Sequence, residues 1–253
     1  MDMRKYTEDE LRFKKMEDKV KKAIFEYGLI NDGDRVLVGL SGGKDSLALV
    51  ELLGRRSKIF QPKFEVVVAH IVMENIPYSS DMDYLRSVAE AQGLPFHVHK
   101  TSFDASTDKR KSPCFLCSWT RRKALFDLSK KYNCNKIALG HHKDDIIQTL
   151  LMNMIQQGAI GTMPPKLKMD KFDMEIIRPL CLLEEKDLVW LAEWRGYKKQ
   201  IKNCPYESGS CRKDAKDLLK KMEELNPNVR DSIWGSTTNI QGNYLPKKIK
   251  FKS

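Results

Sequence analysis

The segment with the clearest chemistry is Ser41–Ser46, which reads Ser-Gly-Gly-Lys-Asp-Ser. Its glycines let the backbone approach a bound group, and its lysine and hydroxyls add a charge and hydrogen-bond donors. An apolar run at 35–40 precedes the segment and leucines at helical spacing follow it, which predicts a strand, a loop and a helix. Because a helix N-terminus favours anions, we predict that this loop binds a phosphate chain, with an ordinary strand-to-helix turn as the alternative.

The loop is not a Walker A motif, because GxxxxGK[ST] would need glycine at Val38 and a hydroxyl residue at Asp45. It resembles the SGGxDS signature of the PP-loop ATP pyrophosphatase family, whose members cleave ATP between the α and β phosphates and pass AMP to a substrate oxygen. The resemblance implies catalytic roles for Lys44 and Asp45. It also implies nucleotide binding by Ser41, Gly42, Gly43, Lys44, Asp45 and Ser46.

A second polar segment, 140–145, reads Gly-His-His-Lys-Asp-Asp and follows the predicted strand 136–140. Carboxylates at a helix start can simply cap the helix. Beside a triphosphate they have another use, because Mg²⁺ takes one or two protein carboxylates together with phosphate oxygens. We therefore expect Gly140, His141 and Asp145 at the nucleotide and Asp45 with Asp145 at the metal.

Two further residues are candidates for contact with the nucleotide. His70, near the end of the predicted strand 64–71, could meet the adenine or ribose, although a strand histidine is more often only packed and hydrogen bonded. Arg178 could act in catalysis by neutralising the α-phosphate, since its guanidinium fits phosphate, and a surface ion pair is the alternative.

The cysteines suggest metal or sulfur chemistry. Cys114 and Cys117 form a CxxC motif at a predicted loop-to-helix junction, and no acidic residue occurs from 109 to 126. A helix N-terminus and nearby cations favour thiolates, which metals require. Cys204 and Cys211 are the candidates to complete the site: four ligands would close a zinc or iron–sulfur site, whereas three leave one position open. Cys134 and Cys181 are better explained as buried small side chains.

The overall charge favours a polyanionic partner. Forty-five Lys and Arg against 34 Asp and Glu leave a net charge of +11, for which general solubility is the alternative explanation. No apolar run approaches the roughly 18 residues needed to span a bilayer, and the charged N-terminal segment does not suit a secretory signal. We expect a cytoplasmic protein without a membrane partner.

Strand and helix patterns alternate along the chain, which predicts an α/β fold with a doubly wound parallel five-stranded sheet and helical N- and C-terminal extensions. The strands are expected at 35–40, 64–71, 96–99, 136–140 and 175–178, and residues 158–171 are expected to form a loop. We divide the chain into an N-terminal helical extension at 1–30, a PP-loop domain with the cysteine site at 31–240 and a basic tail at 241–253. Ligands of such sheets bind at the carboxyl ends of the strands, where both polar segments fall.

A closer resemblance covers most of the chain. The blocks Ser41–Ser46, Cys114–Cys117 with Arg121-Arg122, 138–149, 161–167, 177–180 and Cys204 occur in this order in the TtcA family, tRNA-cytidine 2-sulfurtransferases that thiolate cytidine 32. The resemblance implies ATP, Mg²⁺ and a [4Fe-4S] cluster held by Cys114, Cys117 and Cys204. The pattern departs from the family near the third ligand, where the usual CxxC pair is reduced to Cys204, preceded by Asn203, and Cys211 is an additional thiol that leaves the choice of ligand open.

On this resemblance we expect adenylation of the cytidine C2 oxygen followed by sulfur transfer. The expected partners are the tRNA anticodon loop and a cysteine desulfurase or another sulfur donor, and a homodimer is one assembly to test. Candidate RNA-binding residues are Trp119, Arg121, Arg122, Lys166 and Lys168. The alternatives are another PP-loop adenylating enzyme with structural zinc, of the thiouridine, lysidine or amide synthetase type, and a nucleotide-gated RNA-binding protein without catalysis.

Overall fold

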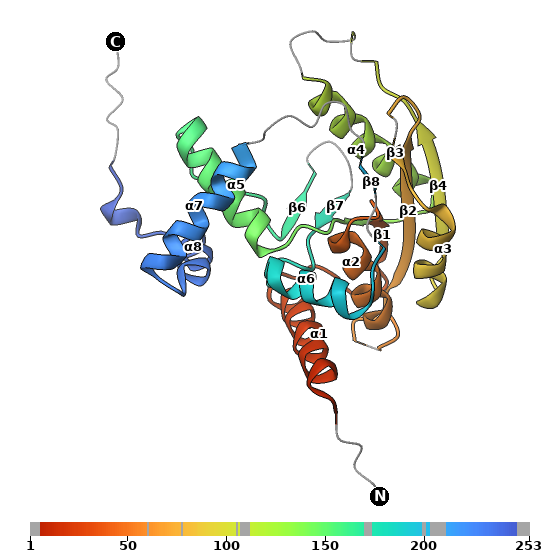
Figure 1. The fold of residues 1–253 in the computed structure, drawn as a ribbon, viewed down its shortest axis with the longest axis horizontal. Helices are drawn as coiled ribbons and strands as arrows, with labels where there is room; N and C mark the ends of the chain where they lie inside the picture. The colour runs from red at the N-terminus through yellow and green to blue at the C-terminus, as the bar shows by residue number, and fades with distance from the viewer. Residues whose placement is uncertain are drawn as a thin grey trace, which may run out of the picture.

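Five parallel strands form the centre of the fold, and a sixth, antiparallel strand lies at one edge, in the order β4-β2-β1-β5-β7-β6 (Figure 1). The computed structural model describes residues 6–59, 61–76, 78–104, 106, 112–169, 174–198, 201–202 and 211–246. The strands are β1 (Arg35–Gly39), β2 (Glu65–Met73), β4 (Phe96–Thr101), β5 (Lys136–Ala138), β6 (Lys166–Lys168) and β7 (Glu175–Ile177). The predicted five-stranded parallel sheet is confirmed.

The helices follow the strands as expected for a doubly wound sheet. They are α1 (Glu8–Glu26), α2 (Lys44–Arg56), α3 (Met82–Ala91), α4 (Pro113–Lys131), α5 (Lys143–Gln157), α6 (Glu185–Trp194), α7 (Cys211–Leu225) and α8 (Val229–Ser236), with a short 3₁₀ helix at Gly242–Tyr244. None of the helices in the described ranges is long and apolar enough to cross a membrane.

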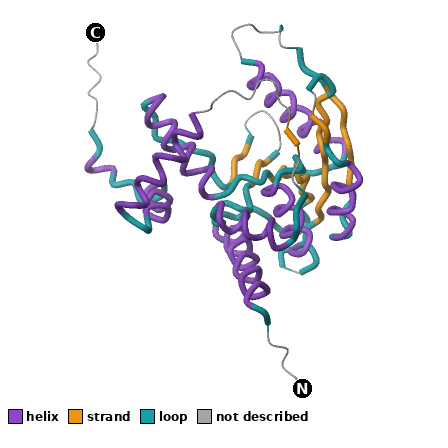
Figure 2. Tube along the Cα trace, viewed as in Figure 1, coloured by secondary structure: helices purple, strands orange, loops and turns teal. Residues whose placement is uncertain are grey.

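Alternate residues of the strands face opposite sides of the sheet. Val36 and Val38 pack in the larger hydrophobic core with α1, α2, α3 and α6, whereas Leu37 and Ile137 pack in a second core with α4. Side chains of successive strand residues point to opposite faces, so both faces must be covered by apolar helix surfaces. The figures show these helices on the two sides of the sheet (Figures 1 and 2).

The strand order reverses at β1, whose neighbours are β2 and β5. Loops leaving adjacent strands at such a reversal run to opposite sides of the sheet and open a crevice at the carboxyl ends. Residues 40–43 follow β1 and residues 139–142 follow β5, so both polar segments identified in the sequence lie at this crevice.

A helical unit beside the sheet is built from α5, α7 and α8 (Figure 2). Ile147 and Leu151 of α5 contact Leu219 of α7 and Val229 of α8 in a separate small core.

The prediction that residues 158–171 form only a loop was wrong, because β6 lies within them. This strand pairs antiparallel with β7, Lys166 opposite Ile177 and Lys168 opposite Glu175. It contains one apolar residue between two lysines, and so short an alternation gives no strand signal. A separate two-stranded ribbon of β3 (Tyr78–Ser79) and β8 (Ile201–Lys202) was also not predicted.

Candidate nucleotide-binding site and cysteine motif

The loop between β1 and α2 is held in shape by its own hydroxyl groups. Ser46 Oγ donates to the Gly43 carbonyl at 2.9 Å and accepts from the Ser41 N–H at 3.1 Å. Gly42 has a φ of +84°, a conformation that favours glycine. Gly43 is the N-cap of α2 and supplies no side-chain cap, so no side chain from this position covers the helix N-terminus. These features suit an anion at the start of α2.

A cavity of about 320 Å³ opens over this loop. Its apolar lining residues include Leu40, Ala69, Ile71, Leu125 and Leu139. Its polar lining residues, which we call the polar part of the cavity, include Ser41, Gly43, Asp45, Ser46, Asp145 and Arg212. A lining with both kinds of group suits a nucleotide, whose base is largely apolar on its faces and whose phosphates need donors and cations.

The β5–α5 loop rests directly on the start of α2. A β-carbon at Gly140 would lie 3.1 Å from the backbone of Asp45 and Ser46, a distance shorter than ordinary van der Waals contact. His141, the next residue, lines the cavity. Gly140 thus contributes to the site because it has no side chain, which lets the β5–α5 loop contact the start of α2.

Asp145 both caps its helix and faces the cavity. Its Oδ2 accepts from the backbone N–H of His142 at 3.1 Å, and its Oδ1 lies 3.7 Å from Arg212 Nη1. Asp45 lines the same cavity and forms an ion pair with Lys44, whose Nζ is 2.9 Å from Asp45 Oδ1 and 4.0 Å from Glu185 Oε1. Asp145 therefore caps its helix and also lines the cavity.

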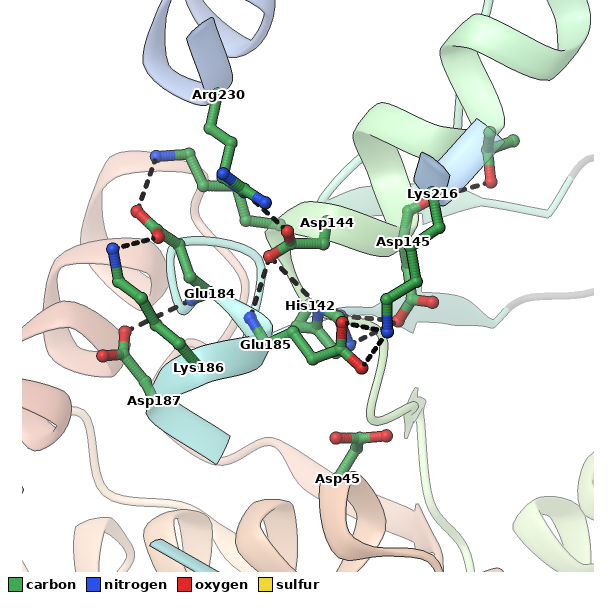
Figure 3. Close-up of polar contacts among 12 residues, drawn as sticks. Asp45, His142, Asp144, Asp145, Glu184, Glu185, Lys186, Asp187, Lys216 and Arg230 are labelled. Atoms are coloured by element: carbon green, nitrogen blue, oxygen red, sulfur yellow. Dashed lines mark hydrogen bonds and ion pairs between the residues drawn. The ribbon is translucent and has the colours of Figure 1, made fainter. Parts of the chain in front are cut away.

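The neighbouring Asp144 has a different environment. It is buried and accepts from the Glu185 N–H at 2.8 Å and from Arg230 Nε at 2.7 Å (Figure 3). Glu185 in turn accepts from Lys216 Nζ at 2.9 Å. These contacts attach α7 and α8 to the helices that surround the nucleotide cavity.

His141 is held neutral in this setting. Burial, followed by the positive charges of Arg178 and Arg212, lowers its pKa to about 4 against the opposing effect of Asp145. A neutral imidazole at the cavity can accept or donate a hydrogen bond without adding charge.

His70 and Arg178 lie beneath the site, outside the cavity lining. His70 is buried, its Nδ1 donates to the Leu40 carbonyl at 2.7 Å, and burial lowers its pKa. Arg178 is also buried and donates from Nη1 to the Pro164 carbonyl at 2.5 Å, so the alternative of a surface ion pair was wrong. The first contact holds Leu40, which lines the cavity, and the second holds the loop that contains Pro164.

The cysteine motif lies in the first turn of α4, where Ser112 Oγ caps the helix and Pro113 occupies its first position. Cys114 is exposed and Cys117 half-buried. With 3.6 residues per turn, Cys114, Cys117, Arg121 and Leu125 form one stripe along the helix. Arg121 and Leu125 line the nucleotide cavity, so the motif continues the face of α4 that borders it.

The third predicted ligand, Cys204, lies outside the described residues, and of Cys211 the structure describes only the backbone, at the start of α7. Within the described ranges, no three His, Cys, Asp or Glu side chains form a group that could hold a metal ion.

The predicted RNA-binding residues do not share one surface. Trp119 is two residues from Arg121, about 200° around the helix, and lines a different cavity. Arg122 is exposed and its Nε donates to the Ser118 carbonyl at 3.3 Å. Lys166 donates to the Gly28 carbonyl at 2.9 Å, whereas Lys168 is exposed on β6.

Arg212 is a candidate that the sequence analysis missed. Its side chain, 51% exposed, lines the polar part of the cavity from the first turn of α7. A cation at a helix N-terminus opposes the helix dipole, and this unfavourable placement was the available signal for an anion nearby.

The fold and this cavity define a protein of the PP-loop class, and the family model described as "PP-loop domain" matches residues 12–200. A tRNA-cytidine(32) 2-sulfurtransferase from Geobacter sulfurreducens is 34% identical over 243 residues, covering 94% of each chain. Another from Bdellovibrio bacteriovorus is 35% identical over 235 residues, covering 91% of this chain and 90% of that one. The chain therefore belongs to the PP-loop family and, within it, to the tRNA-cytidine(32) 2-sulfurtransferase family, as the resemblance predicted.

A solved structure supports the same relationship. The U34-tRNA thiolase NcsA from Methanococcus maripaludis, determined with its [4Fe-4S] cluster, has a TM-score of 0.73 and 28% sequence identity. The match covers 91% of this chain and 80% of NcsA.

Proposed function

We propose that this protein catalyses the ATP-dependent thiolation of cytidine 32 in tRNA, by adenylation of the C2 oxygen followed by sulfur transfer. One observation carries the proposal: Cys117 and Arg121 lie one turn apart on the face of α4 that borders the PP-loop cavity. A base bound there can meet the nucleotide and the cysteine motif without leaving the protein. The names of the relatives support cytidine 32 as the target.

The first step uses the polar part of the cavity. The C2 oxygen attacks the α-phosphorus of ATP, the bond to the β-phosphate oxygen breaks, and pyrophosphate leaves. Lys44 and the N–H groups at the start of α2 stabilise the phosphate charge, and Arg212 is placed to bind the departing pyrophosphate. The bound AMP turns the poor C2 oxygen leaving group into a good one.

Asp45 and Asp145 are the proposed Mg²⁺ ligands. Both carboxylates line the polar part of the cavity, and their two side chains with phosphate oxygens match the donor set that Mg²⁺ prefers. Before metal binds, Lys44 and Arg212 balance the two negative charges.

The second step requires sulfur, and the proposed ligands of a [4Fe-4S] cluster are Cys114, Cys117 and Cys204. A cluster with three cysteine ligands supplies one iron position at which sulfide can bind. The described part of the site fits such a group: two thiols are spaced by one turn, and the first turn of α4 contains no acid. Cys204, whose position the structure does not describe, is assigned from the resemblance.

For the tRNA we propose contacts from Arg121 at the cavity and from Arg122 and Lys168 on the exposed surface. Lys166, hydrogen bonded to Gly28, acts first by fixing the end of α1. We further propose that the protein is cytoplasmic and receives sulfur from a cysteine desulfurase or another donor. A homodimer is the assembly to test.

The deciding experiment is nucleoside mass spectrometry of tRNA from cells that lack the protein. We expect 2-thiocytidine to be absent and to return with the native gene but not with Cys117→Ser. Normal 2-thiocytidine in the deleted strain would contradict the proposed function. Anaerobic purification with iron and sulfide analysis tests the cluster separately, because zinc in place of iron would favour another adenylating enzyme of the PP-loop class.

A further inference from the structure

A second cavity, also of about 320 Å³, lies on the other side of α4 from the cysteine motif. Its helix wall includes Trp119, Lys123 and Asp127, which follow one another at four-residue spacing, together with Leu116, Thr120 and Ala124. Its other wall includes His99, Thr101 and Phe103, at alternate positions along the end of β4 and the residues after it. The cavity is therefore a groove between the edge strand and α4.

Trp119 is 52% exposed, although its helix neighbours Leu116 and Ala124 pack in the core. Lys123 Nζ lies 5.7 Å from the centre of its ring. A large exposed aromatic surface beside a cation is the combination that single-stranded nucleic acids use, the base stacking on the ring and the phosphate pairing with the cation.

The remaining lining groups favour a base inside the groove and a phosphate at its rim. Asp127 and Asp104 carry negative charge that repels phosphate but can accept hydrogen bonds from the amino group of a base. His99 and Thr101 add further hydrogen-bonding groups on the opposite wall. Lys123 is the cation of this wall of α4 and is exposed.

We infer that this groove binds an unpaired nucleotide of the RNA substrate, with its base on Trp119, while a neighbouring base enters the nucleotide cavity. The inference rests on the proposed function, since it assigns a second contact with the same RNA. A helix with its side chains is about 10 Å across, which a short stretch of extended single strand can span, so one strand passing over α4 can reach both cavities. The face of α4 with Trp119 thereby holds the RNA, and the face with Arg121 borders the cavity that the reacting base enters.

The test compares RNA binding by the native protein with Trp119→Ala, Trp119→Phe and Lys123→Gln. Tyr244→Ala, which removes an aromatic ring that is 86% exposed elsewhere, is the matched control. The probes are a fluorescent RNA hairpin with an unpaired loop and a fully paired duplex of the same stem, measured by anisotropy. Thermal unfolding of each variant shows whether the fold is intact.

We expect Trp119→Ala to weaken hairpin binding roughly 10- to 100-fold, with most of the affinity restored by Trp119→Phe, because a stacking platform is lost and then replaced. Duplex binding should be the same in all variants, and the Tyr244→Ala control should bind the hairpin like the native protein. Hairpin binding by Trp119→Ala within twofold of native, or an equal loss for duplex, would overturn the inference. Because binding does not require thiolation, loop binding through Trp119 together with unmodified cytidine would contradict the proposed function alone.

Discussion

The loop after β5 touches the first turn of α2 at Gly140 and Asp45. A β-carbon on Gly140 would lie 3.1 Å from the carbonyl carbon and the carbonyl oxygen of Asp45. These are backbone atoms, which cannot turn aside as a flexible side chain can. The contact sets the position of His141 and Asp145 at the cavity, so the site depends on the absence of a side chain at Gly140.

Gly140→Ala should therefore damage nucleotide binding. We expect a loss of about 1–3 kcal/mol in the free energy of unfolding, as for other overpacked sites. ATP affinity, measured by calorimetry, should fall at least about tenfold because the loops that line the cavity must separate. Gly235→Ala in α8 is the control: a β-carbon there meets no atom within 4 Å, and alanine favours a helix. Native ATP affinity in Gly140→Ala would show that the contact does not position the site.

The sequence was sufficient to predict the sheet and the meeting of the two polar segments. The apolar runs have the length of buried strands, and topology rules place the loops after β1 and β5 at one edge. The cation at the start of α7 was a local signal for a nearby anion, but it could not place Arg212 at this cavity, because that position depends on the packing of α7 against α5. The short strand β6 was also missed, because it depends on pairing with β7.

The contacts of single residues were harder to predict from the sequence than the positions of the motifs. Trp119 and Arg121 are both candidate RNA contacts, and a separation of two helical residues places them on different faces of α4. Lys166, another candidate, donates to the Gly28 carbonyl. A hydrogen bond between residues so distant in the chain depends on the tertiary structure, and residue charge and spacing in the sequence cannot predict it.

Arg212→Gln should weaken binding of ATP more than binding of AMP. Arg212 lines the phosphate part of the cavity beside Asp145, so a contact with the β or γ phosphate is lost while the base and α-phosphate contacts stay. A charge-assisted hydrogen bond of this kind corresponds to roughly 10- to 100-fold in affinity. Calorimetric titrations with ATP and AMP measure the difference.

Lys213→Gln, a loss of the same charge at the next residue, is the control for Arg212→Gln. It should change both affinities by less than about twofold, because an exposed charge away from the ligand is screened by salt. Equal losses for ATP and AMP in Arg212→Gln would indicate a structural role for α7 instead.

Asp144→Asn should loosen the helical unit of α7 and α8. Asp144 is 4% exposed at its side chain and pairs with Arg230, which is 17% exposed, so the change leaves the guanidinium with Glu223 as its remaining carboxylate partner. We expect a loss of about 1.5–3 kcal/mol in the free energy of unfolding. Glu65→Gln is the matched control, because that carboxylate also pairs with an arginine, Arg35, but the Glu65 and Arg35 side chains are 71% and 42% exposed. Its loss should stay below about 1 kcal/mol in chemical denaturation, and equal effects of the two variants would contradict the assignment.

The cysteines should react with iodoacetamide in two groups. Burial raises the pKa of Cys134 to about 11 and that of Cys181 to about 12, so at about pH 8 these thiols are protonated and also covered. Because the folded state disfavours their thiolates, raising the pH toward 11 should increase the reactivity of Cys134 before that of Cys181. Cys114 is exposed and Cys117 half-buried on α4, so in cluster-free protein both should be labelled first, as mass spectrometry of peptides would show.

Reconstitution with iron and sulfide should protect Cys114 and Cys117 and leave Cys134 and Cys181 unchanged, whereas urea without iron should expose all six cysteines. Labelling of native Cys181 as fast as Cys114 would contradict the buried environment, and unprotected Cys114 in iron-loaded protein would exclude it as a cluster ligand.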